Sequence, residues 1–249
     1  MAHYPELKGR HVVITGGGNG IGASLVRAFH TQGAQVSFCD QDEAAGQSLA
    51  AELGDSVSFT KVDLRQEAEV VSWVRHLGEA HGKIDVLVNN AARDPRCSLR
   101  DMTTEQWDDL FALNLRAYFL TCREASAVMP ASSGSIINLS SITFHLAPAE
   151  MSAYVATKAG ILGFTRSLGR ELGPRHIRVN AVSPGWVMTE RQMRQFVTPE
   201  VKELILKSQS IPDLLQPEDI ADVVVFLGSD ASRAMTGQEL LVDRGWMHS

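Results

Sequence analysis

The stretch TGGGNGIG, residues 15–22, directly follows the apolar run HVVIT (11–15) and opens a predicted helix. Gly16, Gly20 and Gly22 allow a tight turn, a close approach of the backbone to a ligand, and close packing of the helix on a sheet. At a turn from strand to helix, the helix N-terminus also offers free N–H groups and a positive dipole end. This stretch therefore predicts an α/β fold with a pyrophosphate-binding loop.

The rest of the chain continues the alternation of short β-rich runs with longer amphipathic runs. This alternation is typical of a parallel sheet covered by helices on both faces. We predict a doubly wound Rossmann fold with a seven-stranded, mostly parallel sheet. The expected strands are HVVIT (11–15), QVSFC (35–39), SVSFT (56–60), DVLVN (85–89), SIINLS (135–140), RVNAVS (178–183) and ELLVD (239–243).

The chain has no linker, repeat or low-complexity tract, so we expect a single domain over residues 1–249. Its hydrophobic content of 44% is sufficient for a large core. The longest stretch without a strand, about 185–216, contains two short predicted helices near 188–197 and 199–208. This helical insertion is either a substrate loop or a peripheral decoration.

Composition excludes several classes of function. The chain has 23 Lys and Arg against 29 Asp and Glu, a net charge of -6, and no basic run, so we expect no nucleic-acid partner. No apolar run approaches the ~20 residues of a membrane span, and the N-terminus lacks a signal-peptide core. We expect a cytoplasmic protein. Cys39, Cys97 and Cys122 lack zinc-site spacing, which indicates free thiols and no metal.

Polar residues follow the next predicted strands. Asp40 ends the second strand eighteen residues after Gly22, where a carboxylate can accept from both hydroxyls of an adenosine ribose and repel a 2′-phosphate. This favours NAD, although Gln41 leaves NADP possible. The alternative is a turn or capping role for Asp40. Asp63 in VDL (62–64) could meet the adenine edge or simply form a turn, and Asn90 would lie beside the cofactor.

The segment SAYVATKAG (152–160) places Tyr154 and Lys158 four residues apart, on one face of a predicted helix. A tyrosine with a pKa near ~10 needs a nearby cation to act as a base at neutral pH. Ser141 in NLSS, thirteen residues before Tyr154, could hold a substrate oxygen. Taken singly, the Tyr/Lys pair could be surface packing and the double serine a turn.

Together these motifs resemble the short-chain dehydrogenase/reductase (SDR) family over almost the whole chain. The matching pieces are TGxxxGxG (15–22), NNAA (89–92), LNLRAYF with Asn114, NLSS with Ser141, YxxxK (154–158) and RVNAVSPGWVMTE (178–190). The resemblance implies that Tyr154 is the general acid/base and that Lys158 activates it and binds ribose. It also implies that Ser141 binds the substrate oxygen and that Asn114 links a proton relay.

The same resemblance implies a nicotinamide cofactor, NAD with NADP possible, and a homotetramer whose interface helices lie around 105–129 and 150–172. Two departures are NNAA for the usual NNAG and DRG, at 243–245, for DGG; Arg244 could therefore alter a subunit contact. The implied cofactor-binding residues are Gly16, Asn19, Gly20, Ile21, Gly22, Asp40, Asp63, Leu64, Asn90, Tyr154, Lys158, Val187 and Thr189.

The predicted substrate wall is polar with a few aromatic rings, which favours a small polyhydroxylated substrate over a steroid or long acyl chain. Its candidates are Asp94, Ser141, His145, Tyr154 and Trp186. His145 could equally be an exposed loop residue.

Within the family, NNAARD, SSIT, MSAY and PGWVMTERQ resemble bacterial aldose 1-dehydrogenases, which oxidise the anomeric hydroxyl of a pentose, hexose or 6-deoxyhexose to a lactone. Another polyol, a keto sugar, a keto sugar acid or a 3-oxoacyl substrate remains an alternative. A non-catalytic nucleotide-binding scaffold is the remaining class, and it would be expected to have lost Tyr154, Lys158 or Ser141.

Overall fold

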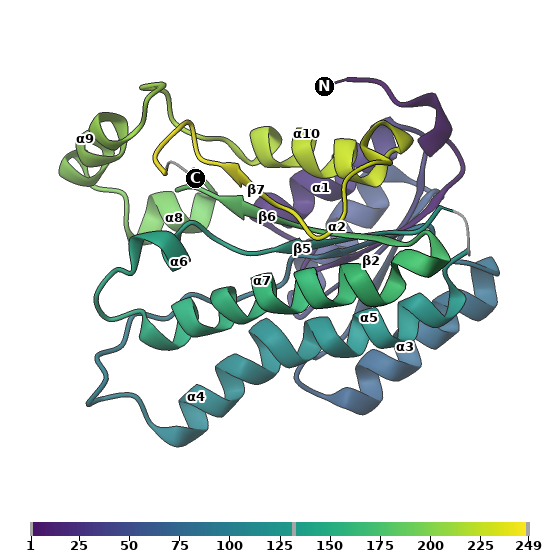
Figure 1. Ribbon diagram of the computed structural model, residues 1–249, viewed down its shortest axis with the longest axis horizontal. Coiled ribbons are helices and arrows are strands. Elements are labelled where there is room, and N and C mark those ends of the chain that lie inside the picture. The colour runs from purple at the N-terminus through teal and green to yellow at the C-terminus, as the bar shows by residue number, and fades with distance from the viewer. Residues whose placement is uncertain (1, 131–132, 248–249) are drawn as a thin grey trace.

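All seven predicted strands are present and form one parallel sheet in the order β3-β2-β1-β4-β5-β6-β7 (Figure 1). The computed structural model describes residues 2–130 and 133–247, so residues 1, 131–132 and 248–249 of the predicted domain lie outside it. The strands are β1 (His11–Thr15), β2 (Gln35–Asp40), β3 (Val57–Lys61), β4 (Val86–Asn89), β5 (Ser135–Leu139), β6 (Arg178–Pro184) and β7 (Glu239–Val242).

Helices cover both faces of the sheet (Figure 1). They are α1 (Gly20–Thr31), α2 (Glu43–Leu53), α3 (Glu67–His81), α4 (Thr104–Phe111), α5 (Ala117–Val128), α6 (Thr143–Leu146), α7 (Ser152–Leu172), α8 (Glu190–Gln195), α9 (Pro199–Ser208) and α10 (Pro217–Gly228). No helix in the described ranges is long and apolar enough to cross a membrane.

The alternation of side chains along β1 separates the two halves of the core. Val12 and Ile14 pack with α1, α2 and α10, whereas Val13 packs with α3, α5 and α7. Every β1 residue is buried, because helices cover both faces of a parallel sheet. Since β1 lies between β2 and β4, the strand order reverses beside it, and the carboxyl ends of these strands form the crevice in which such folds bind ligands.

Two predicted helices have different boundaries in the structure. The helix expected over 105–129 is interrupted by a π-helical turn at Ala112–Arg116, between α4 and α5. The helix expected near 188–197 is shortened to α8, because Val187 pairs with Leu215 in an isolated bridge and Thr189 caps α8 by accepting from Gln192 N–H. The second helix of this stretch, α9, has the predicted bounds 199–208.

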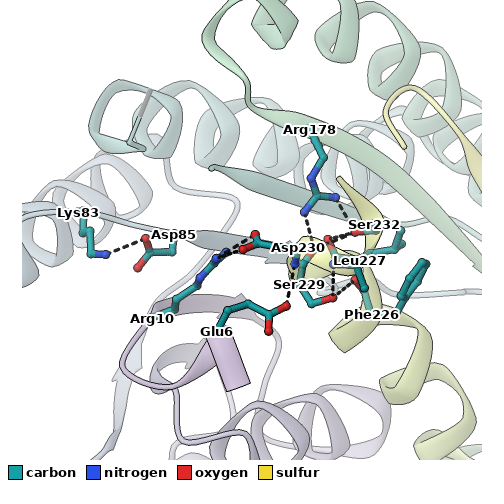
Figure 2. A network of polar contacts seen from close by, with 11 residues as sticks. Glu6, Arg10, Lys83, Asp85, Arg178, Phe226, Leu227, Ser229, Asp230 and Ser232 are labelled. Atoms are coloured by element: carbon teal, nitrogen blue, oxygen red, sulfur yellow. Dashed lines mark hydrogen bonds and ion pairs between the residues drawn. The ribbon is translucent and has the colours of Figure 1, made fainter. Parts of the chain in front are cut away.

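A polar network at the amino-terminal edge of the sheet joins the segment before β1 to the segment after α10 (Figure 2). Arg10 donates through one nitrogen to both carboxylate oxygens of Asp230, at 2.9 and 2.8 Å, and Glu6 accepts from the Asp230 N–H at 3.0 Å. Arg178, the first residue of β6, donates to Ser232 at 2.8 Å. These contacts tie residues before β1 to the segment after α10.

Candidate active site

A cavity of about 890 Å³ opens at the carboxyl ends of the strands. Its wall brings together residues from the loops after β1, β2, β3, β4, β5 and β6, and from α7. Of the predicted site residues, the wall contains Gly16, Asn19, Gly20, Ile21, Gly22, Asp40, Leu64, Asn90, Asp94, Ser141, Tyr154, Lys158, Trp186, Val187 and Thr189.

The glycine loop is packed too closely for side chains. A Cβ on Gly22 would lie 1.8 Å from the Gly16 carbonyl oxygen, and Gly16 itself has a φ of +66°. The Asn90 amide donates to the carbonyls of Gly16, at 2.8 Å, and Thr15, at 3.1 Å, so it holds the loop against the end of β4. A cradle that excludes every side chain in this way fits the close approach of a pyrophosphate.

Asp40 lies in the cavity wall in direct contact with the glycine loop. Its Oδ2 accepts from the Gly18 N–H at 2.9 Å and its Oδ1 from the Asp42 N–H at 3.1 Å. Each carboxylate oxygen retains a further lone pair for a ribose hydroxyl. Of the alternative roles, the cap of α2 belongs to Asp42, which accepts from Ala45 N–H, whereas the bond from Asp42 N–H gives Asp40 a turn contact as well.

Asp63 is committed to a neighbouring arginine. Its two carboxylate oxygens accept from Arg65 Nε at 2.9 Å and from an Arg65 terminal nitrogen at 2.7 Å, and hydrogen bonding by Arg65 lowers the pKa of Asp63. Val62 and Leu64 form the cavity wall at this point. The structure thus places Leu64 in the cavity wall, and Asp63 lies next to it in the chain.

Tyr154 and Lys158 project from the first two turns of α7 toward Ser141. Ser141 lies close enough to Tyr154 to lower the pKa of its phenol, and both side chains line the cavity. Lys158 is 2% exposed, its Nζ donates to the Leu139 carbonyl at 2.8 Å, and this nitrogen lies 5.6 Å from the centre of the Tyr154 ring. The predicted Ser–Tyr–Lys group is therefore assembled at one place.

The electrostatics of this group oppose its ionisation in the ligand-free chain. Burial raises the pKa of Tyr154, the Asp94 carboxylate raises it further, and the hydrogen bond with Ser141 lowers it. Burial lowers the pKa of Lys158 to about 7, with Asp94 acting in the opposite direction. Strongly shifted groups that share a cleft are characteristic of functional sites.

Asn114 lies one layer behind the cavity, in the π-helical turn. Its Oδ1 accepts from the Arg93 N–H at 3.0 Å, and its Nδ2 donates to the Arg93 carbonyl at 2.8 Å and to Thr157 Oγ1 at 3.3 Å. The side chain is fully buried. It joins the loop after β4 to α7, and π turns within α-helices often occur at functional sites.

The polar substrate wall connects α8 to the loop after β4. Asp94 Oδ1 forms an ion pair with Arg191 at 2.6 Å, and Asp94 Oδ2 accepts from Gln192 at 3.0 Å. Gln192 in turn accepts from Trp186 Nε1 at 3.1 Å. Because α8 contains no buried residue, side-chain contacts such as these hold it over the cavity.

His145 lies against β7. Its Nε2 contacts Glu239 Oε1 at 2.8 Å, and the same oxygen accepts from the Ser183 hydroxyl at 2.6 Å. From this segment, Ile142, Thr143 and Leu146 form the cavity wall. The structure therefore separates His145 from the other predicted substrate residues.

Several residues around Ser141, Tyr154 and Lys158 were not among those predicted from the sequence. The Leu139 carbonyl accepts from both Lys158 and the Tyr118 hydroxyl, the latter at 3.1 Å. Thr157 supports Asn114, and Arg191 holds Asp94. Tyr118 lies in the LNLRAYF motif and Thr157 inside YxxxK, so the motifs marked their neighbourhood but not their contacts.

A family model described as enoyl-(acyl carrier protein) reductase matches residues 16–247, and the chain belongs to the short-chain dehydrogenase/reductase family. This confirms the predicted family, the Rossmann fold and the enzyme class, a nicotinamide-dependent dehydrogenase.

Among its relatives, a probable galactose dehydrogenase of Rhizobium meliloti (strain 1021) is 42% identical over 249 residues, covering 98% of this chain and 97% of that one. D-xylose 1-dehydrogenase of Caulobacter vibrioides (strain NA1000 / CB15N) is 42% identical over 250 residues, covering 98% of each. A 3-oxoacyl-[acyl-carrier-protein] reductase of Chlamydia pneumoniae is 38% identical, covering 96% and 97%. The crystal structure of gox2181 superposes with a TM-score of 0.91 at 32% identity, covering 97% and 98%.

Proposed function

We propose that this chain is an NAD-dependent aldose 1-dehydrogenase, which oxidises the anomeric hydroxyl of a pentose, hexose or 6-deoxyhexose to the aldonolactone. The observation that carries the proposal is the meeting of Tyr154, Lys158 and Ser141 in a cavity that also contains the glycine loop and a polar wall. The sugar assignment is supported by relatives named galactose dehydrogenase and D-xylose 1-dehydrogenase.

In this function a bound oxidised nicotinamide supplies the hydride acceptor. Ser141 donates a hydrogen bond to the reacting substrate oxygen, and Tyr154 takes the hydroxyl proton as a phenolate. The charge of Lys158, beside the Tyr154 ring, stabilises the phenolate against the burial that raises its pKa. Asn114, which joins the loop after β4 to α7, would hold a water that links Lys158 to solvent.

The cofactor would lie along the carboxyl ends of β1, β2 and β4. The glycine loop would hold its pyrophosphate, Leu64 and Asn90 would line its path, and Val187 and Thr189 would meet the carboxamide. The Asp40 carboxylate would accept from the ribose hydroxyls, which favours NAD because a 2′-phosphate would be repelled. Asp63 would meet the adenine edge beside Leu64, with its carboxylate held in place by Arg65.

The sugar would lie between Asp94 and Trp186, above Ser141 and Tyr154. Carboxylate and amide oxygens accept from sugar hydroxyls, and the flat indole suits a pyranose face. The pairing of His145 with Glu239 removes it from this proposal.

A second candidate is a 3-oxoacyl reductase, which is favoured by the relative from Chlamydia pneumoniae and by the description of the family model. Another polyol, keto sugar or keto sugar acid would use the same catalytic group. A non-catalytic scaffold is disfavoured, because Ser141, Tyr154 and Lys158 all lie in the cavity wall.

We also propose a cytoplasmic homotetramer in which residues 1–249 form one domain and 185–216 form its substrate loop. A groove of about 540 Å³ crosses α4, α5 and α7, and Phe111, Phe119 and Phe164 line it. Phe119 is 46% exposed. An apolar groove of this kind suits contact between copies of the chain.

The test is the absorbance of reduced nicotinamide, with NAD and NADP in parallel, across L-arabinose, D-xylose, L-fucose, D-galactose, L-rhamnose, several polyols and a 3-hydroxyacyl thioester. We expect reduction of NAD with an aldose and release of its lactone. Activity on the thioester alone would transfer the assignment to the 3-oxoacyl reductase, and activity on a polyol alone would transfer it to the polyol alternative.

A further inference from the structure

Four carboxylates line the cavity, and three of them have partners. Asp40 accepts from two backbone N–H groups, Asp94 is held by Arg191 and Gln192, and Glu190 pairs with Arg194 on the same helix. Within the described residues, the Glu150 carboxylate has no hydrogen bond or ion pair. Glu150 therefore offers an acceptor at the cavity that the protein itself does not use.

The backbone of Glu150 is also unusual. Its φ is +61°, in the left-handed region that disfavours residues with a side chain. Three other non-glycine residues in the described ranges share this conformation, Ala147, His176 and Arg244, and Glu150 is the one that lies in the cavity wall. Strained positions of this kind concentrate at ligand sites, where the side chain has a use that offsets the strain.

The strain is held in place by a contact between two loops at the cavity mouth. The Glu150 carbonyl accepts from the Cys97 N–H at 2.7 Å, which joins the segment before α7 to the loop that contains Asp94. Glu150 lies four residues before Tyr154 and just outside α7. Glu150 is exposed, and it lines the same cavity as Tyr154 and Ser141.

We propose that Glu150 is a specificity-determining residue whose carboxylate accepts hydrogen bonds from substrate hydroxyls remote from the reacting carbon. This inference rests on the proposed function and deepens it, because a carboxylate acceptor requires donors on the substrate. A sugar supplies several such hydroxyls on the carbons next to the reacting one, whereas the acyl part of a 3-hydroxyacyl thioester has no hydroxyl besides the reacting one. The substrate class is thus a neutral polyhydroxylated molecule.

The test is the steady-state kinetics of Glu150→Gly and Glu150→Gln on the aldose that the unaltered protein oxidises best. Removing a charged hydrogen-bond acceptor is expected to raise KM about 10- to 100-fold while kcat changes by less than about threefold. Glu150→Gly relieves the left-handed strain, so its denaturation midpoint is expected to stay equal or rise. Loss of affinity without loss of stability is a result that a purely structural role would not produce.

Ala147→Gly is the matched control, because it relieves the same strain at φ +47° outside the cavity wall. Its KM is expected to equal that of the unaltered protein. An unchanged KM for Glu150→Gly on an oxidised aldose would overturn this inference alone. Absence of aldose oxidation by the unaltered protein would overturn the proposed function, and the inference with it.

Discussion

Tyr154 is held where burial raises the pKa of its phenol, with the Lys158 ammonium one turn along α7. Tyr154→Phe keeps the ring that packs beside Lys158 and removes the proton acceptor. We expect turnover to fall about 10²- to 10⁴-fold or more, the usual contribution of a general acid/base. NAD binding, measured by calorimetric titration, should remain nearly intact. Unchanged turnover would remove Tyr154 from the role of acid/base.

Asp40 is expected to distinguish the two nicotinamide cofactors. Asp40→Ala should raise KM for NAD about 10-fold or more, because charge-assisted hydrogen bonds to ribose are lost, and should affect NADP less. Asp42→Ala, which removes the α2 cap, is the control and should leave the ratio of the KM for NAD to the KM for NADP unaltered. Equal losses for both cofactors after Asp40→Ala would show that Asp40 does not recognise the ribose.

Lys158 makes the stability of the ligand-free chain depend on pH. Its pKa falls from 10.5 to about 7 on folding, so between these values the unfolded chain binds a proton that the folded chain does not. The free energy of unfolding therefore gains a positive slope with pH, at most about 1.4 kcal/mol per pH unit. Lys158→Met should flatten the plot of unfolding free energy against pH, measured by denaturant unfolding between pH 7 and 9. Parallel curves for the two proteins would contradict this linkage.

At the scale of elements, α8 depends on contacts made by its polar side chains. It has no buried residue, and Arg191 and Gln192 attach it to Asp94. Its position over the cavity is therefore less stable than that of α7, which has eight buried residues.

Arg191→Ala should loosen α8 without disturbing the core. We expect faster hydrogen exchange across Glu190–Gln195 and a rise in KM of about 3- to 10-fold, with a smaller change in kcat. Arg194→Ala is the matched control, because its exposed pair with Glu190 lies within the helix and contributes little. Equal exchange rates in both variants would show that the Asp94 contact does not hold α8.

At the scale of the whole molecule, the sheet separates two functions. Its carboxyl edge carries the cavity, and its amino edge carries the network of Arg10, Asp230 and Arg178 that joins the segment before β1 to the segment after α10 (Figure 2). The groove over α4, α5 and α7 occupies a third region, on one helical face. The cavity, the polar network and the groove share no residue, so each can be mutated without changing the other two.

Phe119→Asp tests the proposed assembly, since it places a charge in the apolar groove. We expect sedimentation to show a species smaller than a tetramer, because an unpaired charge is costly to bury. Ile211→Asp, at a side chain that is 52% exposed outside the groove, should leave the mass unchanged. A Phe119→Asp protein that sediments as the unaltered chain does would exclude this face as the interface.

Local patterns in the sequence were sufficient for the strands, the parallel sheet, the glycine loop and the shared face of Tyr154 and Lys158. These follow from properties of neighbouring residues: alternation in strands, a four-residue helical spacing, and glycines that a Cβ would disrupt. The ends of α4, α5 and α8 and the π turn at Ala112–Arg116 could not be predicted from local patterns. In the π turn, for example, Asn114 contacts Arg93 and Thr157, which belong to two distant segments of the chain.

The sequence by itself thus determined the fold and the family, and it predicted that Ser141, Tyr154 and Lys158 would meet. Only the tertiary structure decided which partner each remaining polar group would take. Asp63 lies beside Arg65, His145 reaches Glu239 across ninety-four positions, and no group among the described residues pairs with the Glu150 carboxylate in the cavity wall. The reason is that motif spacing is a local property, whereas the choice among competing partners depends on which strands are neighbours and where each side chain can reach.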